Sequence, residues 1–152
     1  MKIYLDADSC PFKSQVCVLA AKYNLPVVMV MSIAHWSKRG YEAEIVYVDN
    51  QFQAADIYLM NNLEKGDVLI TQDYGLAAVA LSRDCLVLSP RGKEYTRENI
   101  DSLLMERHIK SKLRRGGGRH RGQAAYTEEG KRNFIDNLCC LIKKSMTKFS
   151  SP

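Results

Sequence analysis

Short apolar runs alternate with segments of helical periodicity along most of the chain, and this alternation restricts the fold more than any other feature. The runs at 2–7, 26–31, 44–49 and 85–89, and a further one that starts at Val68, have the composition of buried strands. Helical spacing follows Pro11 and recurs at 52–63, 76–83, after Thr96 and at 128–144. We therefore predict an α/β fold of three layers, in which helices flank a parallel sheet.

One hydrophobic core is expected, because the chain has 152 residues of which 46% are hydrophobic. We predict a single domain over residues 1–146, including a basic loop at 114–126 and a C-terminal helix, followed by a frayed tail at 147–152. No apolar run reaches the ~20 residues that span a bilayer, and Asp6 interrupts the apolar start that a signal peptide would need. The expected location is the cytoplasm, without membrane contact, and the oligomeric state stays open.

Four aspartates lie where this fold would place the carboxyl ends of its strands. Asp6 and Asp8 close the first strand, Asp73 follows the strand that starts at Val68, and Asp56 lies near the start of a helix. Ligands of open α/β sheets bind beyond the strand C-termini, so these carboxylates are expected to converge. Converging carboxylates repel one another unless a cation lies among them. The four are therefore predicted to bind Mg²⁺ or Mn²⁺ and to be the catalytic residues.

The spacing of Asp6 and Asp8 favours a shared cation, because side chains at i and i+2 of a strand project to the same side. A metal held by carboxylates and water can activate a water molecule and neutralise a scissile phosphate, which predicts phosphodiester chemistry. Ser9 and Gln72 adjoin these acids and are candidates to orient bound water. The alternative is that Asp8 and Asp73 only cap helices.

Basic residues are concentrated in the last third of the chain. Residues 101–152 contain 12 Lys and Arg against 5 Asp and Glu, whereas residues 1–100 contain 10 against 12. Such an asymmetry is typical of a protein with a polyanionic partner, here RNA or single-stranded nucleic acid. The candidate nucleic-acid-binding residues are Arg107, Lys110, Arg114, Arg115, Arg119 and Arg121. A solvated helix end followed by a flexible loop is the alternative.

His35 and Trp36 lie in the segment after the second predicted strand. They could overhang the crevice at the strand ends. The other interpretation is a loop anchor held by a buried tryptophan side chain.

Several segments together resemble the YaiI/YqxD family of bacterial proteins, whose function is not settled. They are Asp6-Ala7-Asp8-Ser9-Cys10-Pro11, Ala54-Ala55-Asp56, the stretch from Gly66 to Ala78, the stretch from Pro90 to Ile100, Arg107-His108 and Arg114-Arg115-Gly116-Gly117. The resemblance covers nearly the whole chain. Where the family often has Lys-Gly-Pro before the last helix, this chain has Arg121-Gly122-Gln123.

The family is regarded as a branch of the PIN-like nuclease superfamily. That resemblance implies a parallel sheet flanked by helices and an acidic crevice that binds Mg²⁺ or Mn²⁺. The superfamily's acids would correspond to Asp6 or Asp8, to Asp56 and to Asp73, and Thr71 to its small hydroxyl residue.

Two other functions are open. A haloacid-dehalogenase-like phosphatase also places a D-x-D motif after its first strand, and Ser32 imitates its hydroxyl motif, although Lys65 lies outside the expected crevice. A non-catalytic PIN-like module that binds nucleic acid or protein would keep the fold and the basic surface without turnover.

Overall fold

A computed structural model describes residues 1–36, 40–51, 53–117 and 124–149 of the chain. Its centre is a six-stranded sheet in the order β3-β2-β1-β4-β5-β6. The strands are β1 (Ile3–Asp6), β2 (Val27–Ser32), β3 (Glu44–Val48), β4 (Val68–Ile70), β5 (Leu86–Leu88) and β6 (Glu94–Tyr95). β1 to β5 pair in parallel, which confirms the predicted α/β architecture. The two-residue β6 pairs antiparallel to β5 and was not predicted, because so short a strand has no detectable periodicity.

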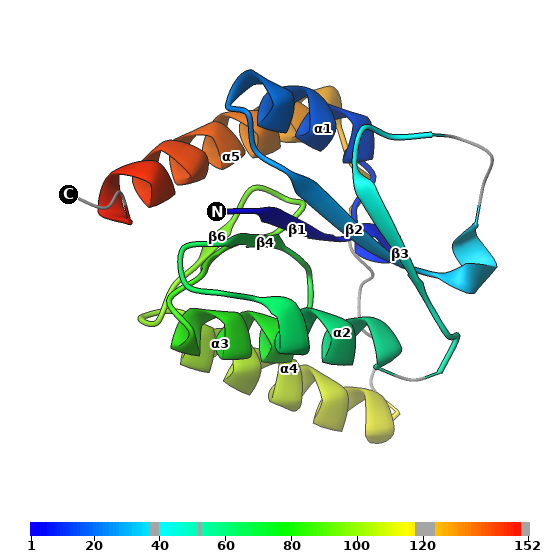
Figure 1. Cartoon of the computed structure of the whole chain (residues 1–152). Helices are drawn as coiled ribbons and strands as arrows, with labels where there is room; N and C mark the ends of the chain where they lie inside the picture. The colour runs from blue at the N-terminus through cyan, green and yellow to red at the C-terminus, as the bar shows by residue number, and fades with distance from the viewer. Residues whose placement is uncertain (37–39, 52, 118–123, 150–152) are drawn as a thin grey trace.

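Helices cover both faces of the sheet (Figure 1). One face carries α1 (Lys13–Lys22) and α5 (Glu128–Lys148); the other carries α2 (Ala54–Asn62) and α3 (Tyr74–Ser82), with α4 (Ile100–Arg115) packed against α3. The alternation within β1 shows why two helical layers are needed. Ile3 and Leu5 face α1 and α5, whereas Tyr4 faces α2 and α3. Each face of the sheet is apolar and has to be covered.

The apolar stripe predicted for the last helix is confirmed, because Phe134, Leu138, Leu141 and Ile142 are all buried against the sheet. The helix extends further than expected, to Lys148, and so includes the start of the predicted frayed tail. Residues 150–152 of that tail lie outside the described residues. The extension has a physical reason, since the Ser145 hydroxyl donates a hydrogen bond to the Gly66 carbonyl oxygen and holds the last turns on the domain.

Other element boundaries moved by a few residues. α1 begins at Lys13 and not at Pro11, and α2 begins at Ala54, with Phe52 outside the described residues. α4 continues to Arg115, so the first two arginines of the predicted basic loop are helical. Of the described residues, no helix is both long and apolar enough to cross a membrane.

Candidate functional site

The strand order changes direction between β1 and β4, because the chain adds β2 and β3 on one side of β1 and β4 and β5 on the other. In doubly wound sheets a crevice opens beyond the carboxyl ends of the strands at this point. Asp6 is the last residue of β1, and Thr71 directly follows β4. Parallel pairing of Leu5 with Ile70 places Asp6 and Thr71 side by side at the carboxyl edge of the sheet.

Thr71 links Asp6 and Asp73 through two hydrogen bonds. Its buried hydroxyl donates to a carboxylate oxygen of Asp6 at 2.9 Å and accepts from the backbone N–H of Asp73 at 3.1 Å. Burial raises the pKa of Asp6, and the charges of Asp8 and Asp73 raise it further, while the Thr71 hydrogen bond opposes the shift. Thr71 therefore favours an ionised Asp6 that its surroundings disfavour.

Asp73 is the N-cap of α3. Its side chain accepts a hydrogen bond of 3.0 Å from the backbone N–H of Leu76, as the capping alternative predicts. Capping and membership of the acidic cluster are compatible, because a carboxylate has several acceptor sites. The positive end of the α3 dipole also favours its charge.

Asp56 lies in the first turn of α2, close enough to Asp73 and Asp6 for their charges to affect it. Burial, the charges of Asp73 and Asp6, and a hydrogen bond with Asp73 raise the pKa of Asp56 to about 6; nearby Arg107 lowers it. Asp6, Asp56 and Asp73 therefore form one interacting group, which we call the acidic cluster.

Asp8 has a different setting from the one predicted. β1 ends at Asp6, and residues Ala7–Ser9 form a 3-10 helix, η1, so the i, i+2 rule for strands does not apply to Asp8. Its two carboxylate oxygens bind the backbone N–H of Ser32 at 3.0 Å and Nδ1 of His35 at 2.9 Å. Asp8 still raises the pKa of Asp6, but its contacts join η1 to the segment after β2.

Ser9 and Gln72 form hydrogen bonds next to Asp6 and have protein partners of their own. The Ser9 hydroxyl donates to the Asp6 carbonyl oxygen at 3.0 Å. The Gln72 amide donates to the Ser9 carbonyl oxygen at 3.2 Å and to the Tyr126 hydroxyl at 2.6 Å. The Tyr126 ring packs edge-on against Phe12, so the segment before α5 contacts the segment between η1 and α1.

Sequence reasoning missed Arg91, because a single arginine in a turn carries no periodic signal. Its guanidinium lies 4.2 Å from the centre of the Tyr126 ring, and its Nη2 donates to the Ala124 carbonyl oxygen. Arg91 therefore holds the segment of Ala124 and Tyr126, which precedes α5.

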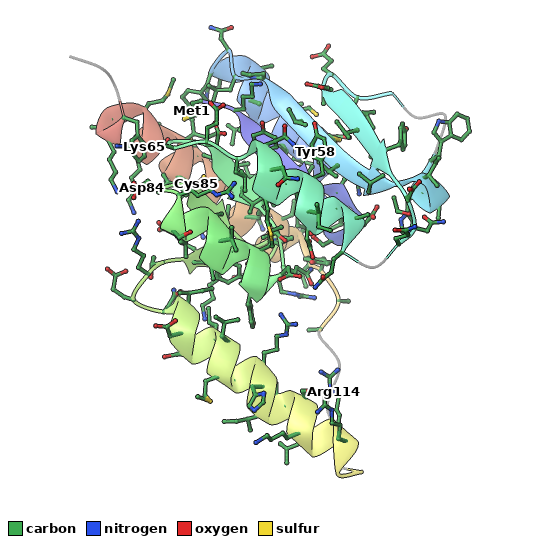
Figure 2. The ribbon with its side chains drawn as sticks, turned by 60° about the horizontal axis from the view of Figure 1, so that its bottom comes forward. Met1, Tyr58, Lys65, Asp84, Cys85 and Arg114 are labelled. Atoms are coloured by element: carbon green, nitrogen blue, oxygen red, sulfur yellow. The ribbon has the colours of Figure 1, made fainter. Side chains whose placement is uncertain are left out.

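Arg107 reaches the acidic cluster from α4. Its Nη1 lies 3.9 Å from Oδ1 of Asp73. Lys110 and Arg114 follow at i+3 and i+7, a spacing that places all three on one side of a helix, while Lys110 also pairs with Glu106 at 2.8 Å. We call Arg107, Lys110 and Arg114 the basic row; Figure 2 shows Arg114 near the end of α4 that extends from the body of the molecule.

Arg115 is exposed beside the basic row at the end of α4. The remaining predicted nucleic-acid-binding residues, Arg119 and Arg121, lie outside the described residues. The structure thus brings Arg107 to the acids and leaves the contribution of the loop arginines as a prediction.

The donors of the acidic cluster are carboxylate oxygens, a ligand type that Mg²⁺ and Mn²⁺ prefer. No group of three or more His, Cys, Asp or Glu side chains in the described part of the chain is arranged to hold a metal ion. An all-protein cage is therefore not present among those residues. Mg²⁺ commonly takes one or two carboxylates and keeps its waters, so metal binding at the acidic cluster stays a prediction.

Comparison with known proteins decides the family. The family described as uncharacterized BCR, YaiI/YqxD family, matches residues 4–144. The chain belongs to the YaiI/YqxD family. A UPF0178 protein of Oceanobacillus iheyensis is 43% identical over 136 residues, 88% of this chain and 93% of the relative. A UPF0178 protein of Enterococcus faecalis is 42% identical over 148 residues, 96% of this chain and all of the relative.

One solved structure is also similar to this YaiI/YqxD chain. A crystal structure of a mutant of Rae1 (YacP) from Bacillus subtilis matches 95% of this chain and 99% of its own, with a TM-score of 0.43 and 17% identity.

Proposed function

We propose that this YaiI/YqxD protein is a metal-dependent, PIN-like phosphodiesterase that cleaves RNA or single-stranded nucleic acid. The observation that carries the proposal is the interacting trio of Asp6, Asp56 and Asp73 at the change of strand order, with Arg107 beside it. Clustered carboxylates alone repel a phosphodiester, so a polyanionic substrate needs a cation among them. Mg²⁺ or Mn²⁺, when bound, would supply a water of lowered pKa and neutralise charge on the phosphate.

The residues have separate tasks in this proposal. Asp56 and Asp73 would hold the cation, and the Thr71 hydroxyl orients the Asp6 carboxylate and favours its ionised form. The ligating form of Asp56 is the deprotonated one, so protons and the metal ion should compete for this carboxylate, and the apparent affinity for the metal should fall as the pH falls. The basic row leads outward from the cluster and can hold phosphates beyond the scissile one.

A cleavage assay tests the proposal. RNA and single-stranded DNA are incubated with Mg²⁺ or Mn²⁺ and the parent, Asp56→Asn, Asp73→Asn or the control Asp136→Asn. Asp136 is an exposed acid on α5, so its replacement removes one charge away from the cluster. We expect both cluster variants to lose about 100-fold or more of the rate, and the control to keep it. Full cleavage by either cluster variant contradicts the assignment.

A binding module without catalysis is the second candidate. It is favoured by the lack of a three-residue ligand set among the described residues. Base-dependent and salt-dependent binding of RNA without cleavage under any metal condition supports this module over the nuclease.

The structure gives less support to a phosphatase. Lys65 precedes β4, and its Nζ lies 5.7 Å from the centre of the Phe149 ring. Figure 2 shows Lys65 near Met1, the start of the chain that leads into β1, and so at the opposite edge of the sheet from the acidic cluster. The Ser32 hydroxyl is bonded to Asn50. A phosphate adduct trapped on Asp6 would reverse this ranking.

A further inference from the structure

Trp36 and Ile33 are exposed on a turn at the carboxyl edge of the sheet. Ile33 is the first residue of the 3-10 helix η2 (Ile33–His35), which directly follows β2, and Trp36 comes directly after this helix. Trp36 is 58% exposed and Ile33 is 57% exposed, so the buried-anchor interpretation of the tryptophan is wrong. The exposed tryptophan and isoleucine leave apolar surface in contact with solvent at this edge, and apolar side chains that gather on a surface often mark a binding site.

η2 is held firmly although its apolar side chains face solvent. Asp8 binds the Ser32 N–H and the His35 ring, while Ala34 N donates to Asn50 at 3.2 Å. The Ser32 hydroxyl also binds Asn50. These contacts restrict the backbone of the turn that carries Ile33 and Trp36, which lowers the conformational entropy that binding would cost.

Asp8 also locates η2 relative to the acidic cluster. The residue lies two positions after Asp6 and contacts Ser32 and His35 directly. β2 and β1 are adjacent and parallel, so both strands end at the same edge. Arg107 reaches the cluster from α4 through Asp73. The cluster therefore has η2 on one flank and the basic row on another.

We propose that η2 binds an unpaired nucleobase, with Trp36 as its stacking surface and Ile33 as the apolar neighbour. The proposal rests on the proposed function and adds a base-binding subsite to it. A strand would place one base on Trp36, a phosphate at the acidic cluster, and further phosphates along the basic row. One indole and one isoleucine match a single planar base, whereas a stable protein interface needs about 800 Å² from each partner.

Fluorescence tests this directly, because Trp36 is the chain's one tryptophan. With EDTA present, a short single-stranded RNA is titrated against the parent, and the same titration is made with a strand of equal charge whose bases are replaced by abasic sites. Stacking predicts quenching of the Trp36 emission by the RNA and little quenching by the abasic strand. Equal quenching by both strands, or none by the RNA, overturns the proposal.

Variants measure the contribution to affinity, with binding followed on a labelled strand. Trp36→Ala should weaken RNA binding by roughly 5- to 150-fold, and Trp36→Phe should restore most of it. Val18→Ala is the control, since Val18 is 73% exposed on α1. Both alanine variants should unfold at the parent's temperature. Equal affinity of Trp36→Ala and the parent contradicts the subsite.

The subsite and the proposed function can fail separately. RNA cleavage by the parent, together with an unchanged KM in Trp36→Ala, contradicts the subsite and leaves the nuclease. Base-dependent quenching without cleavage under any metal condition supports the subsite and contradicts the nuclease. Binding of vesicles or protein with unchanged RNA affinity in Trp36→Ala contradicts a nucleobase as the ligand.

Discussion

The Thr71 hydroxyl donates to the Asp6 carboxylate at 2.9 Å and joins the ends of two neighbouring strands, β1 and β4. The same oxygen accepts from the N–H of Asp73, so one buried side chain orients two members of the acidic cluster.

Thr71→Val should therefore destabilise the fold by about 1–3 kcal/mol, because it removes a donor from Asp6 and leaves the Asp73 N–H without its acceptor. Denaturant unfolding measures the loss. Thr71→Ser keeps the hydroxyl and should retain most of the stability; an equally stable Thr71→Val would show that these bonds contribute little.

Stability without metal should depend on pH through Asp56. Its pKa is raised from 3.8 to about 6 in the folded protein, so the folded state binds this proton more tightly than the unfolded state. The ionisation of Asp56 therefore lowers the free energy of unfolding; this loss is absent below pH 3.8 and complete above pH 6. As the pH rises through this window, the free energy of unfolding of Asp56→Asn should increase relative to that of the parent, by about 1 kcal/mol after allowance for solvent screening. A constant difference between the two contradicts the shift.

Arg107 should control the titration of the cluster. Its charge lowers the pKa of Asp56, so Arg107→Gln should raise that pKa, whereas Arg107→Lys should largely preserve it. Carboxyl carbon NMR across a pH series measures the effect. Identical Asp56 titrations in the parent and Arg107→Gln would mean that the two groups do not interact in solution.

Mg²⁺ or Mn²⁺ should raise the melting temperature, because a cation bound only by the folded state stabilises it by mass action. At ten times the Kd the gain is about 1.4 kcal/mol, or roughly 3–6 °C for a chain of this size. Asp73→Asn should lose most of the gain, while Asp136→Asn, an exposed charge on α5, should keep it. Equal shifts in all three proteins would rule out metal binding at the cluster.

The end of α4 should contribute to nucleic-acid affinity without contributing to stability. Arg114 and Arg115 are exposed, so replacing both with serine should leave unfolding unchanged and lower the salt-dependence slope by about 0.7 per lost contact with a single strand. The matched control is Arg132→Ser with Lys143→Ser, which removes the same charge from exposed positions on α5. If both pairs give the same slope, only net charge matters.

The alternation of apolar runs and helical segments was enough to predict the parallel sheet and its two helical layers, because both depend on local periodicity. The proximity of Asp6, Asp56 and Asp73 was also predictable. In a parallel sheet, the carboxyl ends of the strands and the starts of the helices that follow them lie at the same edge.

Tertiary packing decided the rest. Asp8 leaves the strand geometry because β1 ends at Asp6 and a 3-10 helix follows, and its partners Ser32 and His35 are known only once β2 lies beside β1. The sequence does not distinguish Arg107 from the other basic residues of α4. Its guanidinium lies near Asp73 because α4 packs on α3. The physical reason is the range of the forces: periodicity records which face of an element is buried, while a contact between side chains depends on how separate elements pack.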